Sequence, residues 1–387
     1  MVEIGDWLRA RQAEGTLRAL VGLDHLGHGR VRLTGSAGPA LLDFSSNDYL
    51  ALSEHPALIA AASEALHRYG TGAGAARLMS GNFPVHQELE QAVAALKGQE
   101  AALLFGSGYG ANVGIIAALM GRDDIIFTDR LNHASIYDGC RLAGAKLARF
   151  RHNDLDHLTE LLASRRGKGG ALIVVESVYS MDGDCAPLRE LVRLKERYDC
   201  LLMVDEAHAT GVFGAHGGGM IEEAGVAGGV DLAMGTFGKA LGSYGAYVAA
   251  SRQMIDFLVN RARSFVFSTA LPPAVAAASL AAVRLIRQEP GLRQELHSRV
   301  ALFKECLRQG GISADLGPSQ IIPLQLGASA KAMAMAERLR TQGLFVPAVR
   351  PPTVPEGTAR LRFSITRHLG EVDLAAAAAA LCACCPR

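Results

Sequence analysis

Three residues of complementary chemistry stand at or just beyond the ends of two short apolar segments. Lys239 follows the apolar run 232–234, while Asp205 and His208 follow the apolar run 201–204. A lysine can form an imine with an aldehyde, an aspartate can keep a pyridine nitrogen protonated, and a histidine can face a phenolic oxygen. These are the groups needed to hold pyridoxal phosphate, so the sequence predicts carbanion chemistry on an amino acid.

Two of these residues, Lys239 and Asp205, also have a simpler interpretation. Most lysines are surface residues, but the neighbours of Lys239 are apolar, aromatic or small, and partial burial would lower its pKa as imine formation requires. Asp205 could hold a protonated pyridine nitrogen, or it could cap the next helix. Position alone leaves both interpretations of Asp205 open.

The run Asp205-Glu206-Ala207-His208 also resembles the Walker B segment of nucleic-acid helicases. That function needs a phosphate-binding loop of the form G-x-x-x-x-G-K-[ST]. Around Gly238-Lys239 the loop would need glycine at 233 and serine or threonine at 240, and both positions are alanine. The sequence therefore argues against a helicase.

A glycine-rich segment, Gly106 to Gly110, lies between an apolar run and a helix-like segment. Free N–H groups converge at the start of a helix, so this segment suits a bound anion such as a phosphate, although glycines also make ordinary tight turns. Its spacing is G-x-G-x-G rather than the dinucleotide pattern G-x-G-x-x-G, which disfavours NAD. Thr236 and Ser243 could donate further hydrogen bonds to a phosphate.

Two further residues have side chains suited to a cofactor or a substrate. His133 follows the strand-like segment 124–128 and could stack on a planar cofactor, or it could be a loop histidine. Arg362 alternates with apolar residues in the strand-like segment 359–365. It could clamp a substrate carboxylate, or it could be a surface arginine of an edge strand.

The order of elements predicts an α/β fold with a largely parallel sheet wrapped by helices, because short apolar runs alternate with helical segments. Strands are expected at Ala101–Phe105, Asp124–Thr128, Ala171–Glu176, Leu201–Val204, Asp231–Gly235 and Gly245–Ala250. Helices are expected at Pro56–Tyr69, Gln87–Lys97 and Ala111–Met120, and in an alanine-rich stretch ending near Arg287.

The two ends of the chain are expected to form separate parts. Residues 1–19 favour an amphipathic arm, and residues 31–44 a hairpin that turns at 36–39. After residue 286 a smaller α+β part is predicted, with strands at 321–326 and 359–365 and a polyalanine helix at 375–380. The predicted division is therefore an arm and hairpin at 1–45, a large cofactor-binding domain at 46–285 and a small C-terminal domain at 286–387.

The composition is that of a folded protein. The 387 residues are 49% hydrophobic and 20% charged, which favours a sizeable core, and the net charge of +1 argues against a polyanion as main partner. We expect no nucleic acid, no membrane span and no signal peptide, and hence a cytoplasmic protein. The seven cysteines fit a reducing compartment; Cys382 and Cys385 have metal-site spacing, but they are expected to be free thiols without a metal.

Several segments together resemble the α-oxoamine synthases, a family of fold-type-I pyridoxal-phosphate enzymes, over nearly the whole chain. The matching segments are Asp43–Leu50, Ser180–Asp184, Asp205–His208, Thr236–Lys239, Ser268–Pro273 and Arg350–Pro355. The resemblance implies the aminotransferase-like fold, with a large domain built on a mostly parallel sheet and a small α+β C-terminal domain. The last segment, continuing to Arg362, is most particular to the members that use L-alanine in biotin synthesis.

The resemblance also implies roles for individual residues. It makes Lys239 the imine-forming lysine, places Asp205 on the pyridine nitrogen and His208 near the phenolic oxygen, and stacks His133 on the ring. The other implied cofactor contacts are Gly108, Tyr109, Ser180, Thr236, Ser268 and Thr269. The implied substrate contacts are His133 again, with Arg18, Asn47, Thr353 and Arg362.

The reaction implied is the decarboxylative condensation of L-alanine with a pimeloyl thioester carried on acyl-carrier protein or coenzyme A. Glycine with acetyl-CoA or succinyl-CoA, and serine with palmitoyl-CoA, are alternatives within the family. An inactive scaffold that kept the fold is an alternative of another class. The resemblance further implies a homodimer in which Ser268 and Thr269 reach the phosphate of the second subunit.

Overall fold

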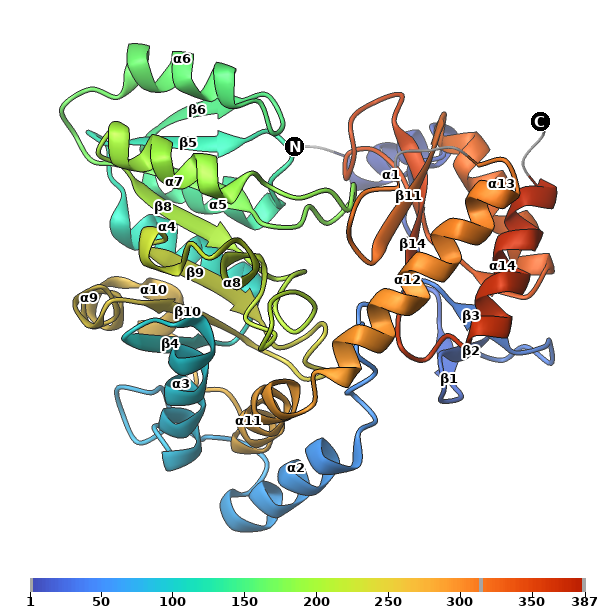
Figure 1. The fold of residues 1–387 in the computed structure, drawn as a ribbon, viewed down its shortest axis with the longest axis horizontal. Helices are drawn as coiled ribbons and strands as arrows, with labels where there is room; N and C mark the ends of the chain where they lie inside the picture. Colours follow the sequence, from blue (N-terminus) through green and yellow to red (C-terminus); the bar gives the residue numbers. More distant parts are fainter. Residues whose placement is uncertain (1–2, 313–315, 385–387) are drawn as a thin grey trace. The chain divides into compact units, whose positions relative to one another are not determined.

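The structure is a computed structural model that describes residues 3–312 and 316–384 (Figure 1). The chain divides into two compact units. The larger unit comprises Leu50–Ser180 and Asp184–Arg293, and the smaller comprises Met1–Tyr49, Met181–Gly183 and Gln294–Arg387. The N-terminal strands thus belong to the same unit as the C-terminal part. The expected domain boundaries at residues 45 and 285 stay a prediction.

The larger unit is built on one twisted sheet. In the described part of the chain its strand order is β4-β10-β9-β8-β7-β5-β6. Neighbouring strands are parallel except at β10, which runs antiparallel to both β4 and β9. The strands are β4 (Ala101–Phe105), β5 (Ile125–Asp129), β6 (Lys146–Phe150), β7 (Ala171–Glu176), β8 (Leu201–Asp205), β9 (Leu232–Thr236) and β10 (Ala246–Ala250).

The prediction of a mostly parallel α/β sheet is confirmed. Strands β4, β5, β7 and β10 are buried along their whole length, which explains their continuous apolar sequences. The strand β6 was not predicted. Its sequence Lys-Leu-Ala-Arg-Phe mixes charged and apolar residues, because it is the edge strand of the sheet and is exposed at three of its five positions.

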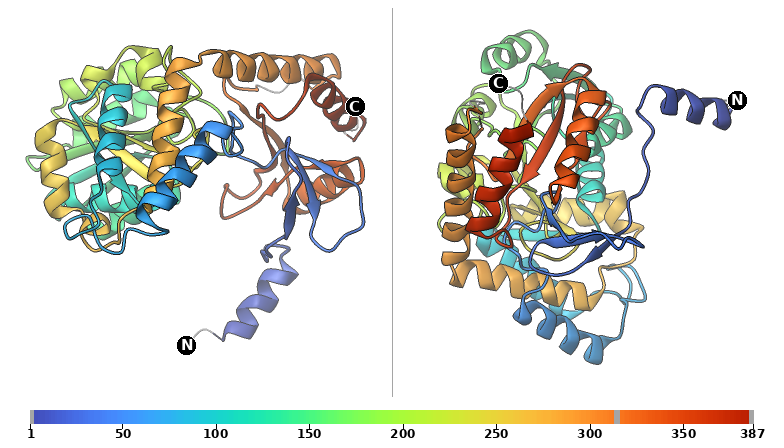
Figure 2. Two further views of the ribbon diagram at one scale, coloured as in Figure 1. Left: turned by 90° about the horizontal axis from the view of Figure 1, so that it is seen from below. Right: turned by 90° about the vertical axis from the view of Figure 1, so that its right-hand side faces the viewer.

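Helices cover both faces of this sheet. They are α2 (Pro56–Tyr69), α3 (Pro84–Lys97), α4 (Gly108–Leu119), α5 (Ala134–Ala143), α6 (Leu155–Arg165), α7 (Leu188–Arg197), α8 (Met220–Ala224), α9 (Arg252–Arg261), α10 (Arg263–Val266) and α11 (Pro273–Gln288). Figure 2 shows α2 and α11 side by side, and these helices pack against each other.

The sequence predicted that the glycine-rich segment 106–110 forms a turn and that the next helix begins at residue 111. The structure differs. Helix α4 already begins at Gly108, and Ser107 caps it by accepting a hydrogen bond from the Gly110 N–H at 3.0 Å. Two of the glycines therefore lie in the first helical turn. The packing supplies a reason for small residues here, since a Cβ at Gly110 would lie 3.3 Å from the Ser107 hydroxyl.

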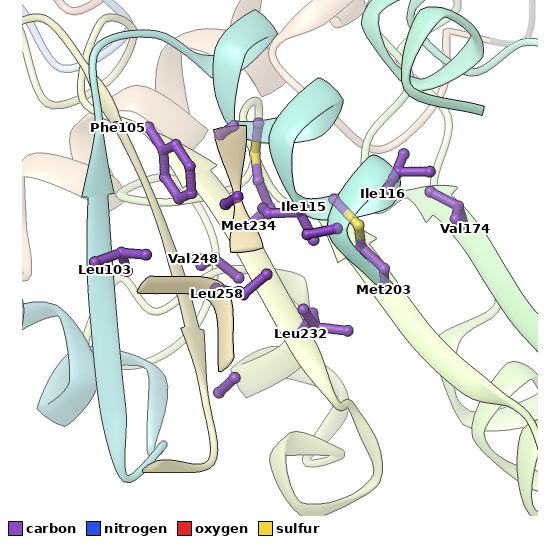
Figure 3. Close-up of a cluster of buried hydrophobic side chains, with 14 of the residues drawn as sticks. Leu103, Phe105, Ile115, Ile116, Val174, Met203, Leu232, Met234, Val248 and Leu258 are labelled. Atoms are coloured by element: carbon purple, nitrogen blue, oxygen red, sulfur yellow. The ribbon is translucent and has the colours of Figure 1, made fainter. Parts of the chain in front are cut away.

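The core on one face of the sheet is formed by side chains that alternate along the strands. Leu103, Met203, Leu232 and Val248 point toward this face and meet Ile115 of α4 (Figure 3). All five are at most 3% exposed. Because alternate residues of β8 share a face, Asp205 continues the row begun by Met203 and lies on the same side as helix α4.

The smaller unit contains two sheets. The first has the order β1-β2-β3-β12 and the second the order β11-β14-β13 among the described residues. The strands are β1 (Leu23–His25), β2 (Arg30–Leu33), β3 (Leu41–Asp43), β11 (Ile321–Gly327), β12 (Leu344–Phe345), β13 (Ala348–Val349) and β14 (Ala359–Ser364). Its helices are α1 (Ile4–Ala13), α12 (Gly291–Gln309, shared with the larger unit at its start), α13 (Ser329–Thr341) and α14 (Glu371–Cys384).

Several predictions for this unit are confirmed. Strands β2 and β3 form the expected hairpin, with Val31 opposite Leu41, and the polyalanine run lies inside α14. The arm is helical only over α1, which buries no residue. Cys385 lies outside the described residues, so the pairing of Cys382 with it is not addressed by the structure. Among the described residues, no helix is both long and apolar enough to cross a membrane.

Candidate active site

The chemically important residues of the larger unit collect at one edge of the sheet. Asp205 ends β8, and Lys239 follows the end of β9 by three residues. His133 follows the end of β5 by four residues and caps helix α5. Because β5, β7, β8 and β9 are parallel, their carboxyl ends meet at the same edge, which is where open α/β sheets bind ligands.

The central contact joins Lys239 to His208. The Nζ atom of Lys239 lies 2.7 Å from Nε2 of His208, which is hydrogen-bond distance. His208 is buried, while Lys239 is only partly buried. Two residues that lie 31 positions apart in the sequence are thus brought into direct contact.

Asp205 is buried and held from two directions. Its Oδ1 accepts the Ala207 N–H at 2.9 Å, and its Oδ2 accepts a hydrogen bond from the Asn112 side chain at 2.9 Å. The same Asn112 amide donates to the hydroxyl of Ser135 at 3.0 Å. The contact with Ala207 is local, as the capping interpretation expected, but the contact with helix α4 fixes the carboxylate toward the sheet edge. The Oδ1 atom of Asn112 has no partner among the described residues.

His133 stands at the start of α5 with a defined ring orientation. Its Nδ1 lies 2.8 Å from the Ser135 hydroxyl and accepts the Ser135 N–H at 3.3 Å. Since Nδ1 is an acceptor, a neutral ring carries its hydrogen on Nε2. Desolvation of the ring lowers the pKa of His133 and Lys239 lowers it further, although Asp205 acts in the opposite direction.

The start of α4 lies against the end of β9. A Cβ at Gly108 would meet Met234 at 3.4 Å and Thr236 at 4.0 Å. The N–H groups of Gly108 and Tyr109 come before the first backbone bond of the helix, in which Ala111 donates to Ser107. Thr236 accepts the Gly238 N–H at 3.1 Å. Three of the expected phosphate contacts therefore lie together in the larger unit.

The remaining expected cofactor contacts differ in their exposure. Ser180 is buried after the end of β7. Ser268 and Thr269 are exposed in the segment between α10 and α11, where Thr269 forms a single bridge with Ala76. Tyr109 is also half-exposed, and its hydroxyl donates to Asp138 at 2.6 Å.

The expected carboxylate clamp, Arg362, belongs to the smaller unit. Its strand β14 is the middle strand of its sheet rather than an edge strand, so the interpretation as a surface arginine is wrong. Arg362 is 5% exposed and donates to Ser364 at 2.7 Å, to Asn47 at 3.2 Å and to Tyr49 at 3.3 Å. The structure thus brings Arg362 and Asn47, both expected at the substrate, into contact.

The two residues expected at the acyl chain are also paired in the smaller unit. An Nη atom of Arg18 donates to the hydroxyl of Thr353 at 2.8 Å. The two residues lie 335 positions apart in the sequence. Both residues were expected from the same family resemblance, and their role at the acyl chain stays a prediction.

Comparison with known proteins gives the family. Residues 39–381 match the model of the family described as aminotransferase class I and II. The chain belongs to this family. The class I and II aminotransferase fold accounts for the central sheet, and the fold class expected from the sequence is confirmed.

Individual relatives show which members of the family are similar to this chain. The chain is 53% identical over 338 residues to the 8-amino-7-oxononanoate synthase of Geobacter sulfurreducens, which is 87% of this chain and 86% of the relative. It is 49% identical to the enzyme of that name from Geotalea daltonii over 98% of this chain and 97% of the relative. These relatives confirm the resemblance to α-oxoamine synthases.

A solved structure extends the comparison to a ligand. A serine palmitoyltransferase from S. paucimobilis with bound pyridoxal phosphate and myriocin has a TM-score of 0.93 and 30% identity, covering 99% of this chain and 96% of that one. The match covers both units of the present chain, so each unit has a counterpart in a solved relative.

The structure adds residues that sequence reasoning missed. Asn112 and Ser135 hold Asp205 and His133, and Glu176 lies beside Asp205 at the end of β7. Glu176 was counted as part of an apolar strand. The available signal was its type: an acid that closes a run of buried aliphatic residues needs a partner or a shifted pKa.

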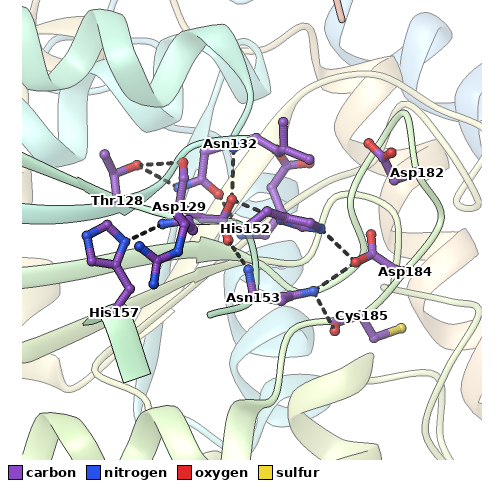
Figure 4. Close-up of polar contacts among 12 residues, drawn as sticks. Thr128, Asp129, Asn132, His152, Asn153, His157, Asp182, Asp184 and Cys185 are labelled. Atoms are coloured by element: carbon purple, nitrogen blue, oxygen red, sulfur yellow. Dashed lines mark hydrogen bonds and ion pairs between the residues drawn. The ribbon is translucent and has the colours of Figure 1, made fainter. Parts of the chain in front are cut away.

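A polar cluster supports the segment after β7. His152 bridges two carboxylates, with Nδ1 3.0 Å from Asp129 Oδ1 and Nε2 2.7 Å from Asp184 Oδ2 (Figure 4). Asn153 donates from its backbone to Asp129 and from its side chain to Asp184, each at 2.8 Å. Burial opposes the charge on His152, but the hydrogen bonds to both aspartates outweigh it and raise its pKa to about 9.

Proposed function

We propose that this protein catalyses the decarboxylative condensation of L-alanine with a pimeloyl thioester, giving 8-amino-7-oxononanoate, CO2 and the free thiol carrier in biotin synthesis. The relatives carry the name of this activity at about half identity over nearly the full chain. The structural observation that carries the proposal is the 2.7 Å contact between Lys239 and His208, with the buried Asp205 on the adjoining strand.

The residues present fit pyridoxal phosphate. A partly buried lysine amine contacts His208, a buried carboxylate lies at the sheet edge, and a helix begins beside Thr236. Two buried polar atoms, Asn112 Oδ1 and Glu176 Oε1, have no protein partner among the described residues, as expected where a ligand completes the site. Gly108, Tyr109 and Thr236 would hold the phosphate.

When bound, pyridoxal phosphate supplies an electron sink that stabilises negative charge at the Cα of an amino acid. Lys239 would then remove the Cα proton of L-alanine with its Nζ, and His208 at 2.7 Å would hold that amine in place. Asp205, as a carboxylate fixed by Asn112, would keep the ring nitrogen protonated. Ser180 and His208 would contact the ring oxygen.

His133 would cover the ring and contribute a hydrogen bond. Its Nδ1 is engaged with Ser135, so the hydrogen of the neutral ring is on Nε2 and can be donated to the thioester carbonyl oxygen. Attack of the alanine Cα on that carbonyl expels the thiol carrier. Loss of the alanine carboxyl group as CO2 then leaves an electron pair at Cα, and Lys239 would return a proton to that carbon.

Arg362 and Asn47 would bind the carboxylate of alanine before it leaves. The guanidinium is buried and already oriented by Ser364 and Tyr49, which lowers the cost of fixing a charged substrate. Arg18 and Thr353 would contact the acyl part of the thioester. These residues belong to the smaller unit, and their roles are part of the proposal.

The proposal includes an assembly and a location. A homodimer is proposed because Ser268 and Thr269 are exposed and would serve the phosphate of the second subunit. A cytoplasmic location follows from the chemistry of the substrates, with acyl-carrier protein or coenzyme A as thiol carrier.

The test is mass spectrometry of the product formed from L-alanine and pimeloyl-CoA by the enzyme saturated with pyridoxal phosphate. The expected product is 8-amino-7-oxononanoate, with one CO2 and one free thiol released for each molecule formed. Parallel reactions pair glycine with acetyl-CoA, glycine with succinyl-CoA, and serine with palmitoyl-CoA. Faster turnover in any of these would replace the proposed substrate pair, and no condensation with any pair would favour an inactive scaffold.

A further inference from the structure

Glu176 occupies a position to which the proposed mechanism gives no role. It ends β7 and is the direct partner of Asp205 in the parallel register of β7 and β8, so both carboxyl groups project from the same face of the sheet. The two residues are 3% and 4% exposed. Two acids are therefore buried side by side at the edge where Lys239 and His208 meet.

The loop that carries His133 is fastened to Glu176. The backbone N–H of Glu176 donates to Asn132 Oδ1 at 3.1 Å, and the Asn132 amide donates to the Val174 carbonyl at 2.8 Å. On the side-chain side, backbone hydrogen bonding from His133 and Ser180 lowers the pKa of the Glu176 carboxyl group and so favours its charged form. One residue thus contacts both loops that carry expected cofactor contacts.

The charge state of Glu176 follows from its surroundings. Burial raises its pKa to about 8, and the neighbouring Asp205 contributes in the same direction, while Lys239 and the two backbone amides oppose the shift. Tyr179, in the segment after β7, is the further titratable group that interacts with it. The Oε1 atom of Glu176 has no hydrogen-bond partner among the described residues, which leaves one carboxyl oxygen available to a ligand.

We propose that Glu176 is a positioning residue of the cofactor site: its carboxyl group, held as a neutral acid, ties the His133 and Ser180 loops together and leaves Asp205 as the single carboxylate for the ring nitrogen. This inference rests on the proposed function only for the identity of the cofactor. Glutamine reproduces the size and neutrality of such an acid, whereas alanine removes the link between the loops.

The first test uses the full chain without cofactor, so it is independent of turnover. Melting temperatures of the wild type and of Glu176→Gln are compared at pH 5.5 and pH 8.5. In the wild type the unfolded chain releases this proton near its ordinary pKa while the folded chain keeps it to about 8, so stability falls with rising pH across that window.

Glutamine removes this pH dependence. The melting temperature of the variant, taken relative to that of the wild type, should therefore be higher at pH 8.5 than at pH 5.5 by about 3 °C or more. Glu196→Gln, at an exposed position of α7, is the matched control and should track the wild type at both. A difference between Glu176→Gln and the wild type that is the same at pH 5.5 and pH 8.5, or that shrinks, overturns the neutral-acid assignment.

The second test measures pyridoxal phosphate itself. Glu176→Gln should bind it within about threefold of the wild type and keep the circular dichroism of its visible band, which reports a fixed ring. Glu176→Ala should bind at least about tenfold more weakly and lose most of that dichroism, with glutamine as the rescuing variant. Equal behaviour of the alanine and glutamine variants, in either direction, overturns the positioning role.

These outcomes separate the inference from the proposed function. If the product assay with L-alanine fails while the glutamine variant shows the expected pH shift and normal ring dichroism, the substrate assignment is wrong and the role of Glu176 stands. If the product forms but Glu176→Ala binds the cofactor normally, the function stands and the inference is wrong.

Discussion

Lys97 Nζ lies 2.7 Å from Glu206 Oε2 in an ion pair whose side chains are 1% and 0% exposed. Glu206 immediately follows Asp205 and points away from it, toward helix α3. Lys97 also donates to Thr210 at 2.8 Å and to the Gly218 carbonyl at 2.6 Å. The chain segment between Asp205 and His208 is therefore held from the opposite side of the sheet by a buried charge pair.

Breaking this pair should be costly. Lys97→Met leaves Glu206 buried without its cation and should lower the free energy of unfolding by about 3–5 kcal/mol, measured by urea denaturation. The double variant Lys97→Met/Glu206→Leu removes both charges and should recover much of that loss. A double variant no more stable than the single one would show that the lysine stabilises the fold mainly through Thr210 and Gly218.

Replacing Lys239 should abolish catalysis without unfolding the chain. Lys239→Ala removes the amine that contacts His208, and turnover should fall by about 10²–10⁴-fold or more, because it loses both the imine and the base. The visible absorbance of lysine-bound cofactor should disappear. Lys168→Ala, at an exposed position, serves as control and should leave both unchanged. A normal visible spectrum in the Lys239 variant would rule out this lysine as the attachment point.

Substitution at Arg362 should act on the amino acid selectively. Arg362→Lys keeps the charge but loses the forked donor geometry, so KM for L-alanine should rise by about 10-fold to 100-fold. KM for the thioester should change little. Arg338→Lys, at an exposed position of α13, is the control. Equal increases in both KM values would point to disruption of the sheet rather than a carboxylate clamp.

The His152 cluster should make stability depend on pH. The pKa of His152 is raised to about 9 in the folded chain. The contribution of His152 to stability is therefore fully present below its ordinary pKa, near 6.5, and is lost as the pH rises through about 9. His152→Asn should therefore be more destabilising at pH 6 than at pH 9.5, as measured by urea midpoints. His67→Asn, at an exposed position of α2, should show no such difference. The His152 ring also packs edge-on against Tyr179, with ring centroids 4.4 Å apart. A penalty independent of pH would mean that His152 acts through this packing.

Much of the site could be predicted from residue types and order. The apolar runs before Asp205 and Lys239 indicated parallel strands whose carboxyl ends coincide, which is a property of the sheet rather than of any contact. The motif resemblance then supplied Arg18 and Thr353, whose hydrogen bond the structure contains. The edge strand β6 was missed because a strand exposed on its outer side carries charged residues that mask its alternation.

The sequence alone determined which functional groups this protein carries, because the types of its side chains do not change with the fold. Only the tertiary structure decided how that chemistry is controlled. In the sequence, Glu176 is only the last residue of an apolar strand. The pairing of β7 with β8 places it beside Asp205. Burial and a neighbouring carboxylate then raise its pKa, and both arise from residues distant in the chain. Electrostatic energies depend on separation in space, which the order of residues does not contain.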